Sequence, residues 1–394
     1  MKTPIQRPIV TQNPENSETP LPEIRSWVTP NSLFFVRNHF AEPEVVADDW
    51  RLQVHGHVRR PRTWTLQELM ELPEHTVFAT MECAGNGRSF LRSEEGVQWG
   101  AGAIGHAEWS GVPLSSVLEQ SSPLTDALEV LCEGADSGSE PDHPEVMRFT
   151  RGLPIQKALH PDTLLAFRMN GEPLSPSHGA PVRLIVPGWY GVCSVKWIGR
   201  LEVLDRAFEG YFQTRKYTIR KQESGSAPRV ARITRMVVKS EIIRPHEGAE
   251  LRPGVNRISG IAWAGEDPVV AVEVSPDGGS KWDRATLAGP QAPYSWTLWE
   301  YLWRVETPGN RMLLCRATSG SGEVQPPWHD KLRGGYMINF SRPHPVRVMG
   351  TGRAEDVPGD AASRLQDLTS QAQELSLKRL DVEMEIGFID GGGI

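Results

Sequence analysis

The sequence contains no long hydrophobic run and no clear export signal. No apolar stretch of the 394 residues approaches the roughly 20 that a helix needs to cross a bilayer. The first residues, MKTPIQRPIVTQNPENSETPLPEI, contain neither an apolar core nor a pair of arginines, and the final DGGGI is no peroxisomal address. We therefore expect a cytoplasmic protein without a membrane segment.

An excess of positive charge is missing as well. The chain has 42 Lys and Arg against 49 Asp and Glu, which gives a net charge of −7. Nucleic-acid binding relies on a surplus of basic residues, so this composition disfavours a nucleic-acid partner. Apolar residues make up 39% of the chain, which is enough to build the cores of two or three globular domains.

Cysteine is scarce, and none of the four cysteines forms a C-x-x-C pair. This excludes the usual zinc-ribbon, thioredoxin-like and c-type haem motifs. In a reducing compartment the cysteines should be free thiols. Cys132, Cys193 and Cys315 lie in strand-like segments, where a buried thiol packs as a small hydrophobic side chain.

Cys83 differs, because it lies in the glycine-bearing, cationic stretch TMECAGNGRSF. Four interpretations fit such a thiol: a core residue, half of a disulfide, a nucleophile, or a metal ligand assisted by a non-protein group. The sequence around Cys83 does not by itself choose among them.

The first part of the chain mixes strands with helices. Residues 1–30 are polar and proline-rich, so we interpret them as an arm laid over the surface or as a disordered lead. In 31–225, Thr65 and Glu68 form a capping-box signature that begins a short helix, and APVRLIVPG predicts a buried strand. The stretch 222–230, QESGSAPRV, is typical of a linker.

The second part, 226–345, predicts an antiparallel β-sandwich. NRISGIAWAG, VVAVEVSPDGG, YSWTLWEYLWRV and NRMLLCRATSG are short alternating strands, and SPDGGSKW is a hairpin signal. The predicted fold class is therefore α+β, with a mixed α+β domain followed by an immunoglobulin-like sandwich. The last residues, 346–394, form an acidic tail with five basic and nine acidic residues (5 − 9 = −4), where leucine spacing at 365–375 is compatible with a helix or with a solvated tail.

Hydrogen-bond donors and cations gather at several points of the first domain. Arg37, Asn38 and His39 follow an apolar run in LFFVRNHF, and Asp136 follows a strand in LCEGADSGS. The stretch SHGAPVRLIVPGWYGVCSVKW adds further donors: His178, Arg183, Ser194 and Lys196. Each has an ordinary structural explanation alone, but together they suit a large anionic ligand with heteroaromatic rings and a phosphate.

In these motifs the chain resembles the sulfite oxidase family of molybdenum enzymes. FFVRNH, CAGNGR, HGAPVR, SVKW, the tyrosine of TRKY, and LRGG occur in the order of the family and cover about 31–345. The resemblance implies molybdenum bound by one pyranopterin dithiolene (molybdopterin) and one protein cysteine. It also implies a mixed α+β cofactor domain followed by an immunoglobulin-like dimerisation domain.

The resemblance assigns roles residue by residue. Cys83 would be the molybdenum ligand, since a soft thiolate suits a high-valent metal already bound by dithiolene sulfurs. The pterin and its phosphate would be held by Phe35, Val36, Arg37, Asn38, His39, Asp136, His178, Arg183, Ser194, Val195 and Lys196. The oxyanion pocket would be lined by Arg37, Arg88, Tyr217 and Arg333, the last reaching in from the second domain.

Two positions depart from the family pattern. Gly87 stands where many members have a basic residue, and Cys193 stands where eukaryotic members tend to have arginine. Both departures remove positive charge near the cofactor. GWYGVCSVKW favours a bacterial, haem-free subgroup.

The resemblance implies oxidation of sulfite to sulfate. Reduction of nitrate or another small oxo compound on the same scaffold is the alternative, and a metal-free binding module is a second one. The sequence has no H-P-G-G loop, no C-x-x-C-H motif and no flavin or dinucleotide fingerprint. We therefore expect no haem, and an external electron acceptor that is either oxygen or a separate carrier protein.

Aromatic residues in YSWTLWEYLWRV motivate a prediction about assembly. Five rings, at Tyr294, Trp296, Trp299, Tyr301 and Trp303, exceed what one side of a small sandwich usually hides. If the segment is one strand, Trp296 lies on the opposite face from Trp299 and Tyr301. The sequence therefore predicts a homodimer through the sandwich, unless the segment bends so that all five rings enter one intramolecular core.

Overall fold

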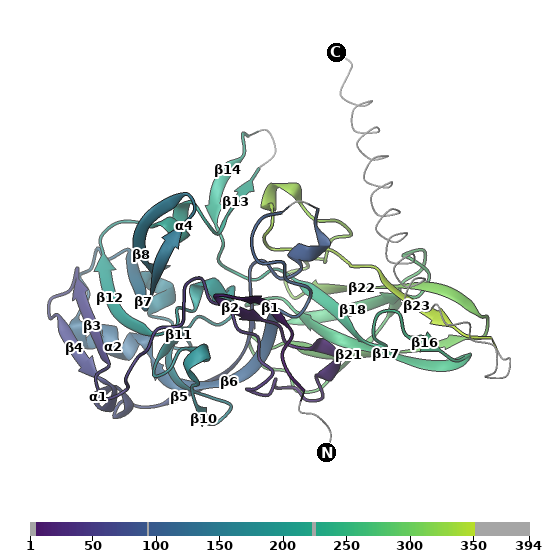
Figure 1. The fold of residues 1–394 in the computed structure, drawn as a ribbon, viewed down its shortest axis with the longest axis horizontal. Coiled ribbons are helices and arrows are strands. Elements are labelled where there is room, and N and C mark those ends of the chain that lie inside the picture. The colour runs from purple at the N-terminus through teal and green to yellow at the C-terminus, as the bar shows by residue number, and fades with distance from the viewer. Residues whose placement is uncertain (1–4, 93, 223–225, 351–394) are drawn as a thin grey trace, which may run out of the picture.

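Strands dominate the computed structural model of the chain, which describes residues 5–92, 94–222 and 226–350 (Figure 1). The α-helices in these residues are short: α1 (Leu66–Met70), α2 (Leu114–Ser121), α3 (Ile155–Ala158) and α4 (Tyr211–Thr214). The 3-10 turns are η1 (Leu21–Glu23), η2 (Arg88–Phe90), η3 (Pro176–His178), η4 (Gly191–Cys193) and η5 (Lys331–Arg333). The predicted α+β class is confirmed, with strands carrying most of the structure.

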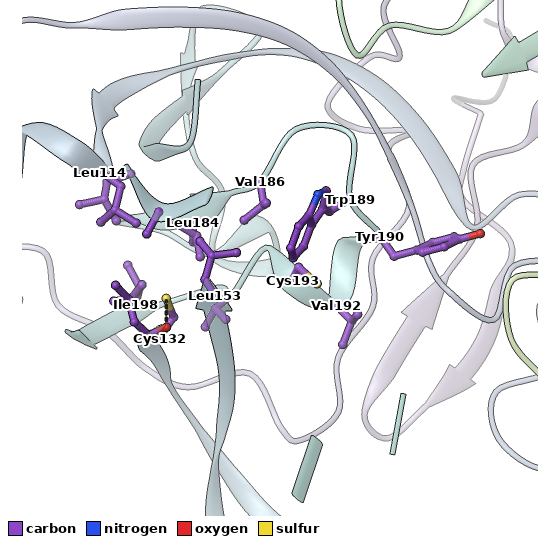
Figure 2. Close-up of a cluster of buried hydrophobic side chains, with 14 of the residues drawn as sticks. Leu114, Cys132, Leu153, Leu184, Val186, Trp189, Tyr190, Val192, Cys193 and Ile198 are labelled. Carbon is purple, nitrogen blue, oxygen red and sulfur yellow. Dashed lines mark hydrogen bonds between the residues drawn. The ribbon is translucent and has the colours of Figure 1, made fainter. Parts of the chain in front are cut away.

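Two five-stranded sheets build the first domain. One contains β5 (His75–Glu82), β6 (Ile104–Pro113), β9 (Leu164–Met169), β10 (Glu172–Pro173) and β11 (Arg183–Ile185). The other contains β3 (Arg51–Gly56), β4 (Arg62–Thr65), β7 (Glu129–Glu140), β8 (His143–Pro154) and β12 (Ile198–Leu204). Figure 2 shows Leu184 of β11 near Cys132 of β7 and Ile198 of β12, all buried in one core.

Local signals in this domain are confirmed. The Thr65 hydroxyl accepts a hydrogen bond from Glu68 N at 3.1 Å, and the Glu68 carboxylate accepts one from Thr65 N at 2.8 Å. This reciprocal pair begins α1 as the capping box predicts. The predicted strand in APVRLIVPG is β11, whose residues are all buried. All four cysteines are free and buried.

The second domain is a sandwich of two sheets, as the sequence predicts. One sheet has the order β15 (Lys239–Arg244), β17 (Gly254–Trp263), β21 (Thr297–Val305), β20 (Thr286–Ala288). The other has the order β16 (Glu250–Leu251), β23 (His344–Val348), β22 (Gly309–Ser319), β18 (Val269–Ser275), β19 (Asp283–Arg284). SPDGGSKW forms the predicted hairpin, since Val274 of β18 pairs with Asp283 of β19.

The aromatic residues of YSWTLWEYLWRV pack within one chain, which corrects the argument that their number requires a homodimer. Trp299 and Trp303 of β21 point into the sandwich core and are 1% and 6% exposed. Trp296 precedes the strand and belongs to the core of the first domain. There its Nε1 donates to Trp27 O at 2.7 Å. The aromatic side chains of this segment are thus divided between the cores of the two domains of the same chain, so their number does not require a partner chain.

The described part of the arm is built into the first domain rather than laid over it. It contains β1 (Ile9–Gln12) and β2 (Glu15–Ser17). Ser17 and Val36 exchange backbone hydrogen bonds of 3.0 and 2.9 Å, and Thr29 N donates to His106 O at 2.7 Å. Asn16, Ser17 and Thr29 are buried. These polar residues are buried because the first domain supplies hydrogen-bond partners for them.

The structure differs from the sequence prediction at the linker and at the tail. Arg229 and Val230, predicted as linker, belong to β14 (Arg229–Arg232), which pairs with β13 (Thr218–Lys221). Ile219 of β13 is 5% exposed and Ala231 of β14 packs against the same core, so apolar side chains of both strands anchor the hairpin. The final strand β23 continues to Val348, past the predicted start of the tail at 346. The candidate helix at 365–375 lies outside the described residues.

No helix in the described part of the chain combines the length and the apolar character needed to cross a membrane.

Candidate functional site

Cys83 lies in a narrow loop immediately after β5. Cys83 N donates to Ala103 O at 2.9 Å, and Asn86 N donates back to Cys83 O at 2.9 Å. Gly87 has a φ of 98°, and a Cβ atom added there would lie 3.2 Å from Ile338 Cγ2. Glycine at position 87 therefore follows from a left-handed backbone that packs closely against the second domain.

The segment 35–39 is held in place by the arm. Asn16 Oδ1 accepts from Arg37 Nη1 at 3.2 Å and from Asn38 N at 2.9 Å. Arg37 Nη2 in turn donates to the Tyr217 hydroxyl at 3.4 Å. Sequence reasoning missed Asn16, because a polar residue in a proline-rich arm carries no spacing signal.

Arg183 organises the loops around β11. Its Nη1 donates to His178 O at 3.0 Å, and its Nη2 donates to Ser194 O at 3.3 Å. The Ser194 hydroxyl accepts from Val186 N at 3.1 Å. One buried guanidinium thus fixes both the loop before β11 and the loop after it.

Lys196 connects this region to the segment 35–39. Its Nζ donates to Ser177 O at 2.9 Å and to Asn38 Oδ1. The same ammonium lies 4.0 Å from the centroid of the Trp197 ring. Asn38 is therefore shared between the segment that contains Arg37 and the segment that contains Lys196.

These segments line one cavity, whose empty volume is about 630 Å³ and includes some open solvent. The predicted site residues in its wall are Phe35, Val36, Arg37, His39, Cys83, Asp136, His178, Arg183, Ser194, Lys196 and Tyr217. The predicted residues outside the lining are Asn38, Val195, Arg88 and Arg333. Most of the predicted set is thus brought together.

Buried positive charge dominates the cavity. Burial lowers the pKa of Arg183 to about 9. Burial and then the charge of Arg183 lower the pKa of Lys196 well below its ordinary value. Burial also raises the pKa of Asp136 to about 6, so the carboxylate opposite these cations is itself poorly solvated. A bound anion would stabilise this arrangement.

Cys83 lies close enough to Arg37 to influence its ionisation. Burial disfavours the charged guanidinium, but the Tyr217 hydroxyl and the Cys83 thiol, when ionised, more than offset this and raise the Arg37 pKa. Arg37 therefore keeps its positive charge on the side of the cavity that contains Cys83.

Two polar atoms in the cavity wall lack partners. Among the described residues, Asp136 Oδ1 and Arg183 Nε are buried without a hydrogen bond. Such atoms are costly unless something satisfies them. A ligand that carries both donors and acceptors would do so.

Tyr336 of the second domain packs against Tyr217, a residue of the cavity wall. The two rings are 5.2 Å apart between centroids, and the Arg88 guanidinium lies 5.1 Å from the Tyr336 centroid. Arg88 Nε donates to Gly335 O at 3.0 Å. Sequence reasoning missed Tyr336, although its position three residues after Arg333 was a usable signal.

Arg333 lies in the same segment but is occupied locally. Its Nη1 donates to Met337 O at 3.2 Å and to Asn339 Oδ1 at 3.1 Å, and its Nε lies 3.7 Å from Asp330. In this structure Arg333 therefore orders the segment that carries Tyr336, while Arg37 and Tyr217 enter the cavity.

A buried arginine accompanies Cys193, the second departure from the family pattern. Arg151 Nη2 lies 3.7 Å from Cys193 Sγ and donates to Ile233 O at 3.0 Å. Burial is the main cause that lowers the pKa of His39, a residue of the cavity wall. The charges of Arg37, Lys196 and Arg151 lower this pKa further, in that order. Positive charge is therefore present here, supplied by β8 instead of position 193.

Comparison with known proteins places this geometry in a family. Residues 39–212 match the model of the oxidoreductase molybdopterin binding domain, and 230–340 match that of the Mo-co oxidoreductase dimerisation domain. Sulfite oxidase of Gallus gallus is 36% identical over 343 residues, which cover 80% of this chain and 72% of the relative. The chain belongs to the sulfite oxidase family.

Other relatives describe the range of this family. Mitochondrial sulfite oxidase of Rattus norvegicus is 34% identical over 83% of this chain and 62% of its own length. The NADH-dependent inducible nitrate reductase 2 of Glycine max is 34% identical over 80% of this chain and 39% of its own length. The chain thus spans less than two thirds of several relatives.

A solved structure supports the architecture. The sulfane dehydrogenase SoxCD from Paracoccus pantotrophus superposes with a TM-score of 0.74 at 30% identity, covering 86% of this chain and 89% of that one. The prediction of a cofactor domain followed by an immunoglobulin-like dimerisation domain is therefore confirmed.

The cavity fits the molybdenum–pyranopterin cofactor that the family implies. Of the described residues in its wall, Cys83 is the only cysteine, and the buried cations and unpartnered atoms suit an anionic, hydrogen-bonding ligand. Among those same parts of the chain, no cluster of three or more His, Cys, Asp or Glu could hold a metal by itself. The donor set therefore suits a metal that brings most of its own ligands.

Burial of His178 predicts a measurable pH dependence of stability. Burial lowers its pKa from 6.5 to about 3, so its contribution is fully present above pH 6.5 and is lost as the pH falls. For cofactor-free protein we expect this one histidine to remove about 2 kcal/mol of unfolding free energy at pH 5. Urea unfolding of the parent and of His178→Gln at pH 8 and pH 5 measures the difference.

His246 provides the control, because it is exposed. The His246→Gln variant should keep the pH dependence of the parent. An equal loss of stability between pH 8 and pH 5 in the parent and in His178→Gln would contradict the buried, neutral state of His178.

Proposed function

We propose that the chain is a molybdenum-dependent oxidoreductase that oxidises sulfite to sulfate and passes the electrons to an external acceptor. The observation that carries the proposal is one cavity in which Cys83 accompanies Arg37 and Tyr217 under excess positive charge. A thiolate suits a high-valent metal, and guanidinium donors suit an oxyanion. Relatives named sulfite oxidase at 33–36% identity support the choice of substrate.

The cofactor would be held by the cavity wall. Cys83 would ligate the metal, while Arg183 and Lys196 would neutralise the anionic parts of the pterin and its phosphate. Asp136 would accept hydrogen bonds from ring N–H groups, since one of its oxygens has no partner within the described residues. The remaining contacts would come from Phe35, Val36, His39, His178 and Ser194 in the wall. Asn38 and Val195, which lie outside the lining, would support these residues from behind.

The metal, when bound, supplies the oxygen transfer and the two-electron change, and the protein binds and orients. Arg37 would bind an oxygen of the substrate anion, and Tyr217 would donate a hydrogen bond to it. The Arg37–Tyr217 hydrogen bond of 3.4 Å prealigns these two donors. Arg88 and Arg333 would add positive charge from the second-domain side, through the segment that carries Tyr336.

Nitrate reduction on the same scaffold is the second candidate. The observation that favours it is the 34% identity to a soybean nitrate reductase over 80% of this chain. Arg333, which the resemblance assigns to the oxyanion pocket, does not favour either substrate, because its guanidinium is bound within its own segment. The choice of sulfite therefore rests on the relatives, and parallel steady-state assays with sulfite and nitrate decide it.

The acceptor and the assembly are also proposals. We propose that the electrons pass to oxygen or to a separate carrier protein, and that the chain binds no haem. The cytoplasmic location stays a prediction. We assign 31–225 to cofactor binding, together with the arm at 1–30. We assign 226–345 to pairing. The acidic tail, predicted at 346–394, has its first residues within β23, which ends at Val348. The matches at 39–212 and 230–340 support this division.

Replacement of Cys83 by serine tests the metal assignment. The alcohol is a poor ligand in place of the thiolate, so Cys83→Ser should fold, lose molybdenum or its activity, and oxidise no sulfite above background. Elemental analysis and a sulfite assay measure both effects. Cys315→Ser is the control, because that thiol is buried in the second domain. Undiminished sulfite oxidation by Cys83→Ser would reject the assignment.

Removal of the Arg37 charge tests substrate binding. A hydrogen bond to a charged group contributes about 1.5–3 kcal/mol, so Arg37→Gln should lower kcat/KM for sulfite by about ten- to a hundredfold. Arg333→Gln should cost less, because its charge acts at longer range. The exposed Arg304 provides the control, and Arg304→Gln should behave as the parent. An unchanged kcat/KM in Arg37→Gln would contradict this role.

A homodimer through the second domain remains the expected assembly. Its support is the dimerisation-domain match, together with Leu302 and Val255, which are 65% and 57% exposed on the sheet that contains β17 and β21. Light scattering at micromolar concentration should give the mass of two chains. Leu302→Glu should then shift the mass toward one chain, because a charge cannot be buried cheaply in an apolar contact. A single-chain mass for the parent would end the proposal.

A further inference from the structure

A buried ion pair connects the Cys83 loop to the second domain. Glu82 directly precedes Cys83, and Lys239 begins β15 of the sandwich. Lys239 Nζ lies 3.3 Å from Glu82 Oε1, and the two side chains are 3% and 2% exposed. Neither residue lines the cofactor cavity, so the pair lies behind the thiol rather than beside the ligand space.

Three donors fix the Glu82 carboxylate. Oε1 accepts from Asn86 Nδ2 at 3.0 Å and from Lys239, and Oε2 accepts from Trp263 Nε1 at 2.9 Å. Trp263 belongs to β17, so two strands of the second domain hold one carboxylate of the first. Both oxygens are engaged, which leaves the side chain little freedom to rotate.

Asn86 transmits this arrangement across the loop. Its Nδ2 donates to Glu82, its Oδ1 accepts from Ala103 N at 3.0 Å, and its backbone N donates to Cys83 O at 2.9 Å. Through its side chain and its backbone, Asn86 therefore joins the residue before the thiol, the thiol residue itself and the residue that precedes β6. A shift of Glu82 would be passed directly to the Cys83 backbone.

The second domain also holds the backbone of the loop. Met337 N donates to Ala84 O at 2.7 Å, and Lys239 Nζ lies 3.5 Å from Asn86 O. The loop is thus fixed from both domains, on either side of Cys83.

Stability alone is a poor explanation for such a pair. Removing two charges from water costs several kcal/mol per ion, and an apolar pair of similar volume often stabilises a protein equally well or better. What the charged pair adds is direction, because a carboxylate with three donors has one favourable orientation. That orientation is set at the residue adjacent to the thiol.

We propose that Glu82 and Lys239 are positioning residues, which set the orientation of the Cys83 thiolate toward the metal. The second domain thereby becomes part of the metal site without contributing a ligand. The inference rests on the proposed role of Cys83 as the metal ligand, and on no assumption about the substrate. Partners of a metal ligand, when removed, typically cost about 10–100-fold in metal affinity or activity.

The test compares two double variants of the full-length protein. Glu82→Gln with Lys239→Met replaces the pair by neutral side chains of similar size, so that no buried charge remains unpaired. Lys157→Met with Glu266→Gln is the matched control. Lys157 and Glu266 also form an ion pair between the domains, at 2.6 Å, but do not touch the Cys83 loop.

Four measurements are made on each protein: molybdenum per chain, the Mo(V) electron paramagnetic resonance spectrum after dithionite reduction, the alkylation rate of Cys83 by iodoacetamide in metal-free protein, and the steady-state kcat and KM for sulfite. For Glu82→Gln/Lys239→Met we expect lower molybdenum content or shifted g values, a severalfold change in alkylation rate, and a kcat about 10–100-fold lower with little change in KM. The control should match the parent in all of them.

The outcomes separate this inference from the proposed function. A parent that contains molybdenum but does not oxidise sulfite would reject the substrate, while the spectra and the alkylation rates would still test the positioning. A parent that oxidises sulfite, with a double variant indistinguishable from it in spectrum, metal content and alkylation, would overturn the inference alone.

A milder substitution covers failure of the double variant to fold. Glu82→Gln alone keeps an oxygen acceptor for Trp263, and Lys239 keeps Glu241 at 3.7 Å. This variant should show the same spectroscopic and alkylation changes with smaller amplitude. Parent-like values in a folded Glu82→Gln protein would count against the proposal.

Discussion

The first domain buries several cations together in the wall of one cavity. Among the described residues of the cavity wall, Arg37, Arg183 and Lys196 face one carboxylate, that of Asp136, and burial lowers the pKa of both Arg183 and Lys196. Such an arrangement is costly until an anion binds, so ligand binding and the stability of this domain are thermodynamically linked. The chain as a whole carries −7, so the cations of the cavity form a local positive region in an acidic protein, where an anionic ligand would meet it.

The second domain completes the site through contacts that surround the Cys83 loop. Arg88 is anchored to Gly335 O, Ala84 O is bonded by Met337 N, and the left-handed Gly87 packs against Ile338. These contacts are mostly backbone hydrogen bonds and van der Waals contacts, which tolerate little displacement because interiors are closely packed. The two domains consequently behave as one unit at the loop, although each has its own sheets and core. A change at their boundary therefore acts on the thiol as well as on stability.

Sequence reasoning succeeded where the signal is local. The capping box at Thr65, the hairpin after β18 and the strands of the sandwich each depend on residues a few positions apart. It failed where a contact joins distant segments. Asn16 holds Arg37 across 21 positions of the chain, and Trp296 leaves its own domain to pack in the other. Periodicity places a side chain on a face of an element, but it does not say which element covers that face, so the linker and the aromatic segment were misread.

Cys193 and Arg151 show that the charge at a site depends on which side chains the fold brings there, not on the residue at one sequence position. From the sequence alone, cysteine at position 193, where eukaryotic family members tend to have arginine, removes a cation from the cofactor region. In the fold, β8 brings Arg151 within 3.7 Å of that sulfur, and its charge reaches His39 in the cavity wall. A guanidinium is long enough to occupy a similar region from another strand, because its charge lies several bonds from the backbone. The electrostatic demand of an anionic ligand can thus be met from different strands, whereas the described cavity wall offers a single cysteine, Cys83, for the proposed metal bond.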